Sequence, residues 1–136
     1  MPTIKISDPL RQRLHDETVA WLTTVRRDGT PQPAPVWFLW DGETFLIYSQ
    51  PEARKVRNIR ENPRVAINLN SDEEGGKVAV FWGRAVLDPG APRVDQVAAY
   101  LEKYRQGIAD IGMNPESMAG EYSLAIRVTV ERVRED

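Results

Sequence analysis

The sequence contains no cysteine and a single histidine, His15. Without cysteine the chain can form no disulfide, has no thiolate nucleophile and cannot ligate zinc through sulfur. One histidine leaves carboxylates as the other metal ligands, and the acidic run SDEE at 71–74 is followed by two glycines, which favours a mobile loop over a metal site. We therefore expect neither a metal centre nor thiol-based redox chemistry.

Long apolar runs and an excess of one charge are also missing. The chain has 18 basic and 20 acidic residues, so it carries no overall field that would hold a nucleic acid or an anionic membrane. Its first residues have no apolar signal core, and no apolar run approaches the roughly 20 residues that a membrane span requires. We expect a soluble, cytoplasmic protein that contacts neither nucleic acid nor membrane, in which any anion site is local.

What is present is a succession of strand and helix signals over 136 residues, which suits a single domain, 1–136. β-Branched and aromatic runs separated by turns such as RDGT predict antiparallel strands, and apolar residues at helical spacing predict helices. The expected class is α+β, a barrel of six or more antiparallel strands with flanking helices. The expected strands are 19–26, 31–40, 43–49, 64–70, 77–88 and 123–136, and the expected helices are 8–17, 51–61 and 92–108.

The first half of the 31–40 strand carries proline at every second position, at Pro31, Pro33 and Pro35. Proline has no N–H to donate, so all three missing donors lie along one edge of the strand. We therefore expect this half to be an edge or splayed strand, which leaves room for a ligand.

The second half of the same strand, APVWFLW, is apolar on both faces. Strand alternation sends Trp37 and Leu39 to one face, and Val36, Phe38 and Trp40 to the other. A strand of this kind is buried between layers, or is covered by a partner subunit or a flat ligand. An ordinary barrel core with a dimer interface explains the pattern as well as a ligand does.

Residues 49–67, SQPEARKVRNIRENPRVAI, concentrate basic side chains in one short predicted helix that opens at Pro51. A helix start exposes unpaired N–H groups and the positive end of the helix dipole, and both suit a phosphate or carboxylate. Ser49 and Gln50 are expected at that start. Neither a GxGxxG nor a GxxxxGK motif occurs, so a dinucleotide fold or a phosphate loop is not indicated.

Within this helix Arg54 and Asn58 lie one turn apart on one face, with Lys55 adjacent, so two cations and an amide could converge on one phosphate. The alternative is a solvated helix whose basic face pairs with Glu52 or Glu61. An apolar strand one hairpin before the helix favours the anion site, because a planar slot beside a phosphate site fits a nucleotide-like cofactor.

Residues 21–67, WLTTVRRDGTPQPAPVWFLWDGETFLIYSQPEARKVRNIRENPRVAI, resemble the pyridoxamine 5′-phosphate oxidase-like (PNPOx-like) split β-barrel superfamily. The resemblance is greatest to its actinobacterial F420-dependent oxidoreductase branch, the FDOR-B type, and it spans nearly the whole chain. Its most specific segments are DGTPQPAPVWF, KVRNIRENPRV and the GRA strand at 83–85. It implies an FMN-binding type of split barrel and a homodimer with two equivalent cofactor sites at the subunit interface.

The resemblance also implies which residues hold the deazaflavin coenzyme F420. One group lies along the ring system, a second surrounds the ribityl phosphate, and a third comes from the second subunit. In that order the groups are Pro35, Val36, Trp37 and Phe38; Ser49, Gln50, Arg54, Lys55 and Asn58; and Lys77 and Trp82.

Flavin mononucleotide (FMN) is the alternative cofactor, since it shares with F420 a three-ring plane, a ribityl chain and a phosphate. F420 carries an additional lactyl–glutamyl tail. Arg57 and Arg60 would serve this acidic tail or simply the surface, and the excess of basic residues beyond one phosphate favours F420.

The predicted function is an F420-dependent reductase that transfers a hydride to a small conjugated electrophile such as an enone, quinone or nitro compound. The protein then needs mainly to bind the cofactor and orient an acceptor, and no catalytic side chain is required. Solvent or Tyr48 would supply a proton where one is needed, and His15 is expected to be a surface or packing residue. The alternatives are an F420-binding or carrier protein without turnover and an FMN-dependent oxidase of the pyridoxamine phosphate oxidase type.

Two tyrosines of the predicted 92–108 helix, Tyr100 and Tyr104, belong to its apolar stripe. This spacing predicts an ordinary packed helix. Together with Met113 they would alternatively cap the mouth of a pocket.

Overall fold

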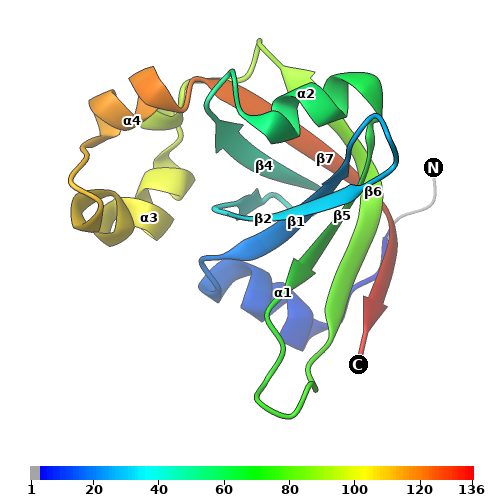
Figure 1. Ribbon diagram of the computed structural model, residues 1–136. Coiled ribbons are helices and arrows are strands. Elements are labelled where there is room, and N and C mark those ends of the chain that lie inside the picture. Colours follow the sequence, from blue (N-terminus) through cyan, green and yellow to red (C-terminus); the bar gives the residue numbers. More distant parts are fainter. Residues whose placement is uncertain (1–3) are drawn as a thin grey trace.

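A computed structural model of the protein describes residues 4–136 as a curled antiparallel sheet with helices at its ends and side (Figure 1). The strands are β1 (Ala20–Val25), β2 (Pro31–Val36), β3 (Leu39–Trp40), β4 (Thr44–Ser49), β5 (Arg64–Leu69), β6 (Ala79–Asp88) and β7 (Leu124–Glu135). The helices are α1 (Asp8–Asp16), α2 (Arg54–Glu61), the short 3₁₀ helix η1 (Val94–Gln96), α3 (Ala98–Asp110) and α4 (Pro115–Glu121).

The seven strands form one sheet in the order β2-β1-β5-β6-β7-β4-β3, and every pair is antiparallel. Figure 1 shows α2 across one end of the curled sheet and α1 at the other. The predicted α+β split barrel of six or more strands is confirmed. No helix within residues 4–136 is long and apolar enough to cross a membrane.

The proline-rich strand β2 lies at one edge of the sheet, as predicted. Its prolines stand opposite β1 in the register Pro31–Val25, Pro33–Thr23 and Pro35–Trp21. Each proline occupies a position that needs no donated hydrogen bond, so pairing with β1 survives while the free edge cannot recruit another strand.

The predicted strand 31–40 is in fact two strands, and this corrects the sequence interpretation. The backbone N–H of Phe38, between them, donates to the Tyr104 hydroxyl at 2.8 Å. The Phe38 carbonyl accepts from Lys103 Nζ at 3.1 Å. Because α3 takes both backbone groups of Phe38, the sheet ladder is interrupted there.

The basic helix also begins later than predicted. Its first residue is Arg54, preceded by a turn in which the Ala53 N–H donates to the Gln50 carbonyl at 3.2 Å. Ser49 ends β4 and Gln50 lies in the connection, so neither residue stands at the helix start as the sequence interpretation placed them. The predicted core face of the helix is confirmed, because Val56 and Ile59 are buried.

The predicted helix at 92–108 is divided into η1 and α3, and α4 was not predicted. Asn114 caps α4: its side chain accepts from the Ser117 N–H at 2.8 Å, and Ser117 Oγ accepts from the Asn114 N–H at 3.0 Å. Pro115 follows at the first helical position. Asn114, Pro115 and Ser117 form a helix-start pattern that can be recognised in the sequence.

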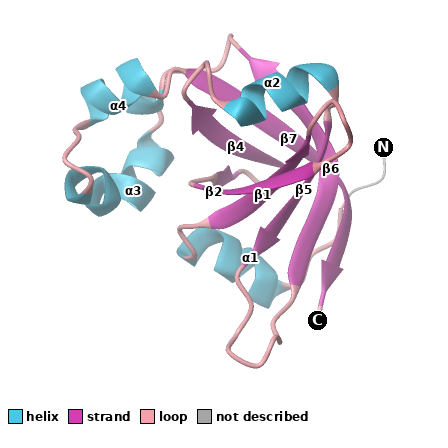
Figure 2. Cartoon of the chain, in the orientation of Figure 1, coloured by secondary structure: helices cyan, strands magenta, loops and turns pink. Residues whose placement is uncertain are grey.

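Two hydrophobic clusters pack the chain, and strand alternation at 36–40 supplies both, as predicted. Val36 and Phe38 belong to the barrel core and the partly buried Trp40 packs against it, whereas Trp37 and Leu39 pack against the other cluster. This second cluster, the lobe cluster, joins β4 and β7 to the helical lobe, defined as η1, α3 and α4. The lobe stands beside the sheet (Figure 2).

Gly83 sits at an irregularity in the β6–β7 pairing, between Trp82 and Gly83. A Cβ at this position would lie 2.1 Å from the Thr129 carbonyl oxygen, closer than any side chain allows. The strands can therefore approach here only because residue 83 is glycine.

Candidate functional site

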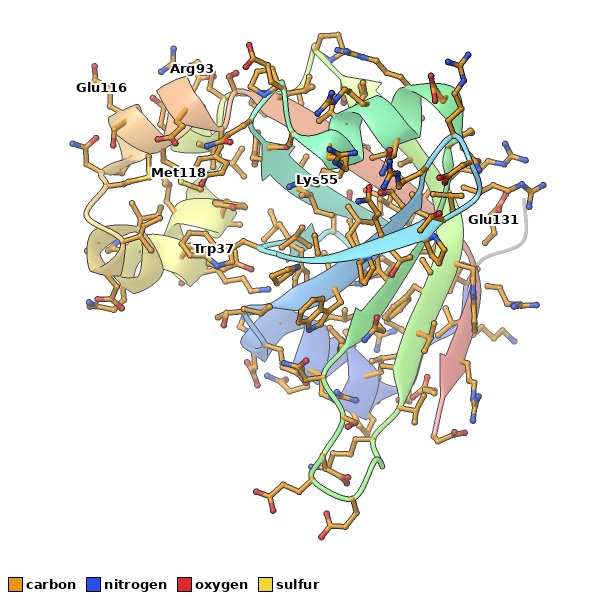
Figure 3. The ribbon with its side chains drawn as sticks, in the orientation of Figure 1. Trp37, Lys55, Arg93, Glu116, Met118 and Glu131 are labelled. Atoms are coloured by element: carbon orange, nitrogen blue, oxygen red, sulfur yellow. The ribbon has the colours of Figure 1, made fainter. Side chains whose placement is uncertain are left out.

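A cavity of about 300 Å³ lies where β2, α2 and the helical lobe meet. The sheet side contributes Pro35, Val36 and Trp37, and α2 contributes Lys55. The lobe closes the opposite side with Tyr100, Met118 and Tyr122, and Tyr48 of β4 lies between. Figure 3 shows Trp37, Lys55 and Met118 around this space. The cavity thus combines a mostly apolar, aromatic lining with one ammonium group.

Four of the predicted cofactor residues come together in this cavity: Pro35, Val36, Trp37 and Lys55. They converge because Val56, next to Lys55, is fully buried under α2, which holds the helix against the barrel and directs its neighbour to the rim. Lys55 is half-buried, and this burial lowers the pKa of its ammonium group. No charged neighbour within residues 4–136 offsets that desolvation.

Trp37 is fixed from behind by α3. Its indole stacks on the Tyr104 ring with centroids 4.6 Å apart and an interplanar angle of 8°. Gly107 of α3 makes room for this stack, since a Cβ there would lie 3.2 Å from Trp37 Cη2. The ring is thereby held as a rigid wall of the cavity.

Phe38 takes no direct part in the cavity. Its side chain is fully buried in the barrel core, with the Lys103 ammonium 3.7 Å above its ring. Strand alternation explains this outcome, because Phe38 and Trp37 necessarily point to opposite sides.

The residues just before α2 are held by the chain itself. The buried Ser49 hydroxyl donates to the Gln50 carbonyl at 2.9 Å, and the Gln50 amide donates to Glu121 Oε1 at 2.8 Å. Arg54 is exposed on the first turn of α2. These three residues lie near the helix start but do not line the cavity.

Asn58 is buried, with 7% of its surface exposed. Its Nδ2 donates to Thr24 Oγ1 at 2.9 Å and to Gln32 Oε1 at 2.8 Å. The amide therefore fastens α2 to β1 and β2, and both of its N–H groups are used within the chain.

Lys77 and Trp82 lie away from the cavity. Lys77 is exposed in the β5–β6 connection with a φ of 54°, and its carbonyl accepts from Arg13 Nη1 at 2.8 Å. Trp82 faces outward on β6, with the Arg132 guanidinium 4.2 Å from its ring centroid. Both were predicted as second-subunit contributions. Trp82 stands on the side of the sheet opposite the barrel core, because its neighbour Phe81 points into that core.

Tyr48 lines the cavity, but its hydroxyl donates to the Pro92 carbonyl at 2.6 Å. Burial raises the pKa of this phenol. His15 is exposed beside Asp16, and residues 4–136 contain no cluster of three or more potential metal-ligating His, Cys, Asp or Glu side chains.

The lobe residues Met118 and Tyr122 were missed by the sequence interpretation. Met118 lies in α4 and Tyr122 directly follows it, and the start of this helix can be recognised in the sequence. No local pattern, however, indicates that this helix would close a cavity on β2. Arg57 and Arg60 are exposed on α2.

A family model described as pyridoxamine 5′-phosphate oxidase matches residues 6–135. Among solved structures, an F420 reductase is 25% identical over 95% of this chain and 98% of its own, with a TM-score of 0.69. The conserved hypothetical protein Rv2991 from Mycobacterium tuberculosis is 20% identical over 99% of this chain and 87% of its own, with a TM-score of 0.75. HutZ, a heme storage protein from Vibrio cholerae, is 20% identical over 94% and 93%, with a TM-score of 0.65. The last two likenesses show the fold alone.

Proposed function

Because this chain belongs to the pyridoxamine 5′-phosphate oxidase family, we propose that its cavity binds coenzyme F420 and that the protein is an F420-dependent reductase of small conjugated electrophiles. Enones, quinones and nitro compounds are the substrate classes. The F420 reductase among the similar structures, which matches nearly end to end, supports this choice within the family.

The observation that carries the proposal is the meeting of Trp37 and Lys55 in one cavity. The stacked, rigid indole and the neighbouring Pro35 and Val36 form an apolar wall suited to a flat ring system. Lys55 has lost hydration without gaining a charged partner, so a phosphate would favour its ammonium form. A tricyclic ring joined to a phosphate matches both features.

When bound, reduced F420 supplies the hydride. The residues of the chain would bind and orient: Trp37 and Val36 along the ring, Lys55 at the phosphate, and Arg54 and Arg57 on the exposed side of α2 toward an acidic tail. The lobe would exclude water from the opposite side through Met118. Ser49 and Gln50 would support the turn that leads into α2.

The proposed assembly is a homodimer formed through the outer face of the sheet, the face away from the barrel core. Cross-strand pairing places Trp21 beside Pro35 on one side and Asn68 on the other. Trp82 lies one row further along, and Val86 at the end of β6 is 60% exposed. A partly exposed apolar sheet face of this kind is typical of a subunit contact.

The outer face and the cavity are continuous, since Pro35 belongs to both. A partner seated on this face would bring its own Trp82 and Lys77 toward the rim of the cavity. Light scattering should therefore report a dimer for the wild-type protein and a monomer for Trp82→Glu. A wild-type monomer at working concentration would remove the assembly from the proposal.

The cofactor is tested by fluorescence titration of the protein with F420 and, separately, with FMN at matched salt. Lys55→Ala should weaken binding of F420 about tenfold or more, because a charge-assisted contact to phosphate is lost. Arg105→Ala, which removes a charge from an exposed position of α3, is the matched control. Unchanged affinity in Lys55→Ala would contradict the site.

Turnover is then measured from reoxidation of reduced F420 by an enone, a quinone and a nitro compound. Tight F420 binding without turnover of any of these would instead indicate a carrier protein. Preference for FMN would move the protein to the oxidase side of the family.

A further inference from the structure

Three buried tyrosines meet in the lobe cluster: Tyr48, Tyr100 and Tyr104. Two of them use their hydroxyl groups within the protein. Tyr48 donates to the Pro92 carbonyl, and the Tyr104 hydroxyl accepts from the Phe38 N–H and lies 2.8 Å from the Thr18 carbonyl oxygen. Their polar ends are thus satisfied by backbone groups.

Tyr100 differs from both neighbours. Only 1% of its surface is exposed, and its hydroxyl makes no hydrogen bond within residues 4–136. Among these residues the one side-chain polar atom that is both sealed from solvent and unpartnered is Trp40 Nε1. The Tyr100 hydroxyl is therefore not sealed, and the cavity is the space that Tyr100 lines.

The ring of Tyr100 has little freedom to seek a partner elsewhere. It packs edge-on against Tyr48 at a centroid distance of 5.4 Å, and it lies tilted by 40° against Tyr104 at 4.8 Å. Burial and the neighbouring phenols raise the pKa of Tyr100, so its hydroxyl stays protonated. It is a fixed, neutral hydrogen-bond donor.

We infer that Tyr100 donates a hydrogen bond to a carbonyl oxygen of the substrate, and that the cavity therefore selects flat apolar carbonyl compounds, quinones and enones, over oxygen-free molecules of the same shape. This inference rests on the proposed function for its substrate class. A buried donor left without an acceptor is unfavourable, so a site built around one discriminates strongly against a ligand that cannot accept. The remaining lining, with Trp37 and Met118, is apolar and suits the body of such a molecule.

The test compares menadione, a quinone, with 2-methylnaphthalene, its hydrocarbon counterpart, by equilibrium dialysis against the full chain without added cofactor. The wild-type protein should bind menadione more tightly. Tyr100→Phe should weaken menadione about tenfold, the loss of one hydrogen bond to a neutral acceptor, and leave 2-methylnaphthalene unchanged or tighter. Arg105→Ala, at an exposed position of α3 that does not line the cavity, should change the affinity for menadione less than twofold. Equal losses for both compounds in Tyr100→Phe would reduce the residue to a packing role and overturn the inference.

A melting experiment guards against a structural explanation. Phenylalanine fills the same space as tyrosine and leaves no unpartnered hydroxyl, so Tyr100→Phe should melt at or above the wild-type temperature. A loss as large as that of Tyr104→Phe would show that the Tyr100 hydroxyl already has a partner in the free protein, and the inference would be wrong.

The two proposals fail separately. Absence of F420 binding would reject the proposed function, while the menadione preference is measured without cofactor and stands or falls on its own. Where both hold, Tyr100→Phe should lower kcat/KM for menadione about tenfold with the affinity for F420 unchanged.

Discussion

The barrel core and the lobe cluster are built from different kinds of side chain. The barrel core packs phenylalanine and aliphatic residues, and its central rings Phe38, Phe45 and Phe81 meet edge to face. The lobe cluster packs tyrosines instead, and two of these carry hydrogen bonds to backbone carbonyls. Burial of apolar side chains stabilises the fold but is not directional, whereas hydrogen bonds fix the distances and angles between the groups that they join. The cavity lies beside the lobe cluster, the region in which hydrogen bonds hold side chains in place.

The two regions are joined by residues 36–40, which feed side chains to both. Phe38 connects them most directly, since its ring belongs to the barrel core while its N–H and carbonyl are bound by α3. A substitution in the lobe should therefore change the shape of the cavity more than the packing of the barrel core, because the Trp37 wall contacts α3 directly.

The largest expected effect comes from the barrel core. Phe45→Ala removes a fully buried ring and should lower the free energy of unfolding by about 3–5 kcal/mol, measured by urea denaturation. Arg105→Ala, at an exposed position of α3, should change it by less than about 0.5 kcal/mol. A small loss in Phe45→Ala would mean that the barrel core is less tightly packed than its contacts indicate.

The next largest effect is expected in the lobe, where the free energy of unfolding should fall because a hydrogen bond is lost and not because a space is left empty. Tyr104→Phe leaves the buried Phe38 N–H without its acceptor, so we expect a loss of about 1–3 kcal/mol in the same urea assay. Lobe and barrel would prove independent if this variant unfolded like the wild type.

A third variant should change the cavity more than the stability. Gly107→Ala gains up to about 1 kcal/mol of helix propensity, but its Cβ meets Trp37 Cη2 at 3.2 Å and must displace the indole toward the cavity. We expect a melting temperature near that of the wild type and a severalfold weaker affinity for F420 by fluorescence titration. Unchanged affinity for F420 together with an unchanged melting temperature would show that the indole can move away from the new Cβ without loss of binding or stability.

The smallest effect concerns Lys103, which ties α3 to the carbonyls of Leu14 and Phe38. Burial lowers the pKa of Lys103 to about 8 from 10.5, against smaller opposing effects of Asp16 and Glu17. Between these pH values the unfolded chain binds more protons than the folded chain, so the free energy of unfolding rises as the pH rises through them. Because the side chain is only half-buried, solvent screening limits the gain to about 1 kcal/mol or less.

Urea unfolding of the wild type and of Lys103→Met at pH 7 and pH 9.5 checks this sign. The wild type should gain relative to the variant at the higher pH. A relative loss would show that the two carbonyl contacts stabilise the ammonium more than burial disfavours it.

Local sequence patterns determined much of the fold and part of the site. Proline at alternate positions placed β2 at an edge, and the APVWFLW alternation divided its side chains between two clusters. The helical spacing of Val56 and Ile59 buried one face of α2 and so brought Lys55 to the cavity. Each of these outcomes depends only on the side of its own strand or helix to which a side chain points, and the sequence periodicity specifies that side.

Only the tertiary structure decided which elements would meet. Asn58 shows this, since its amide is taken by Thr24 and Gln32 from strands distant in the chain. Tyr100 shows it again: its helical spacing predicted a core residue, and the packing of the lobe also placed it in the lining of a cavity that Lys55 shares. A polar group's role depends on which partner reaches it, and that partner comes from non-local packing, which no local pattern encodes.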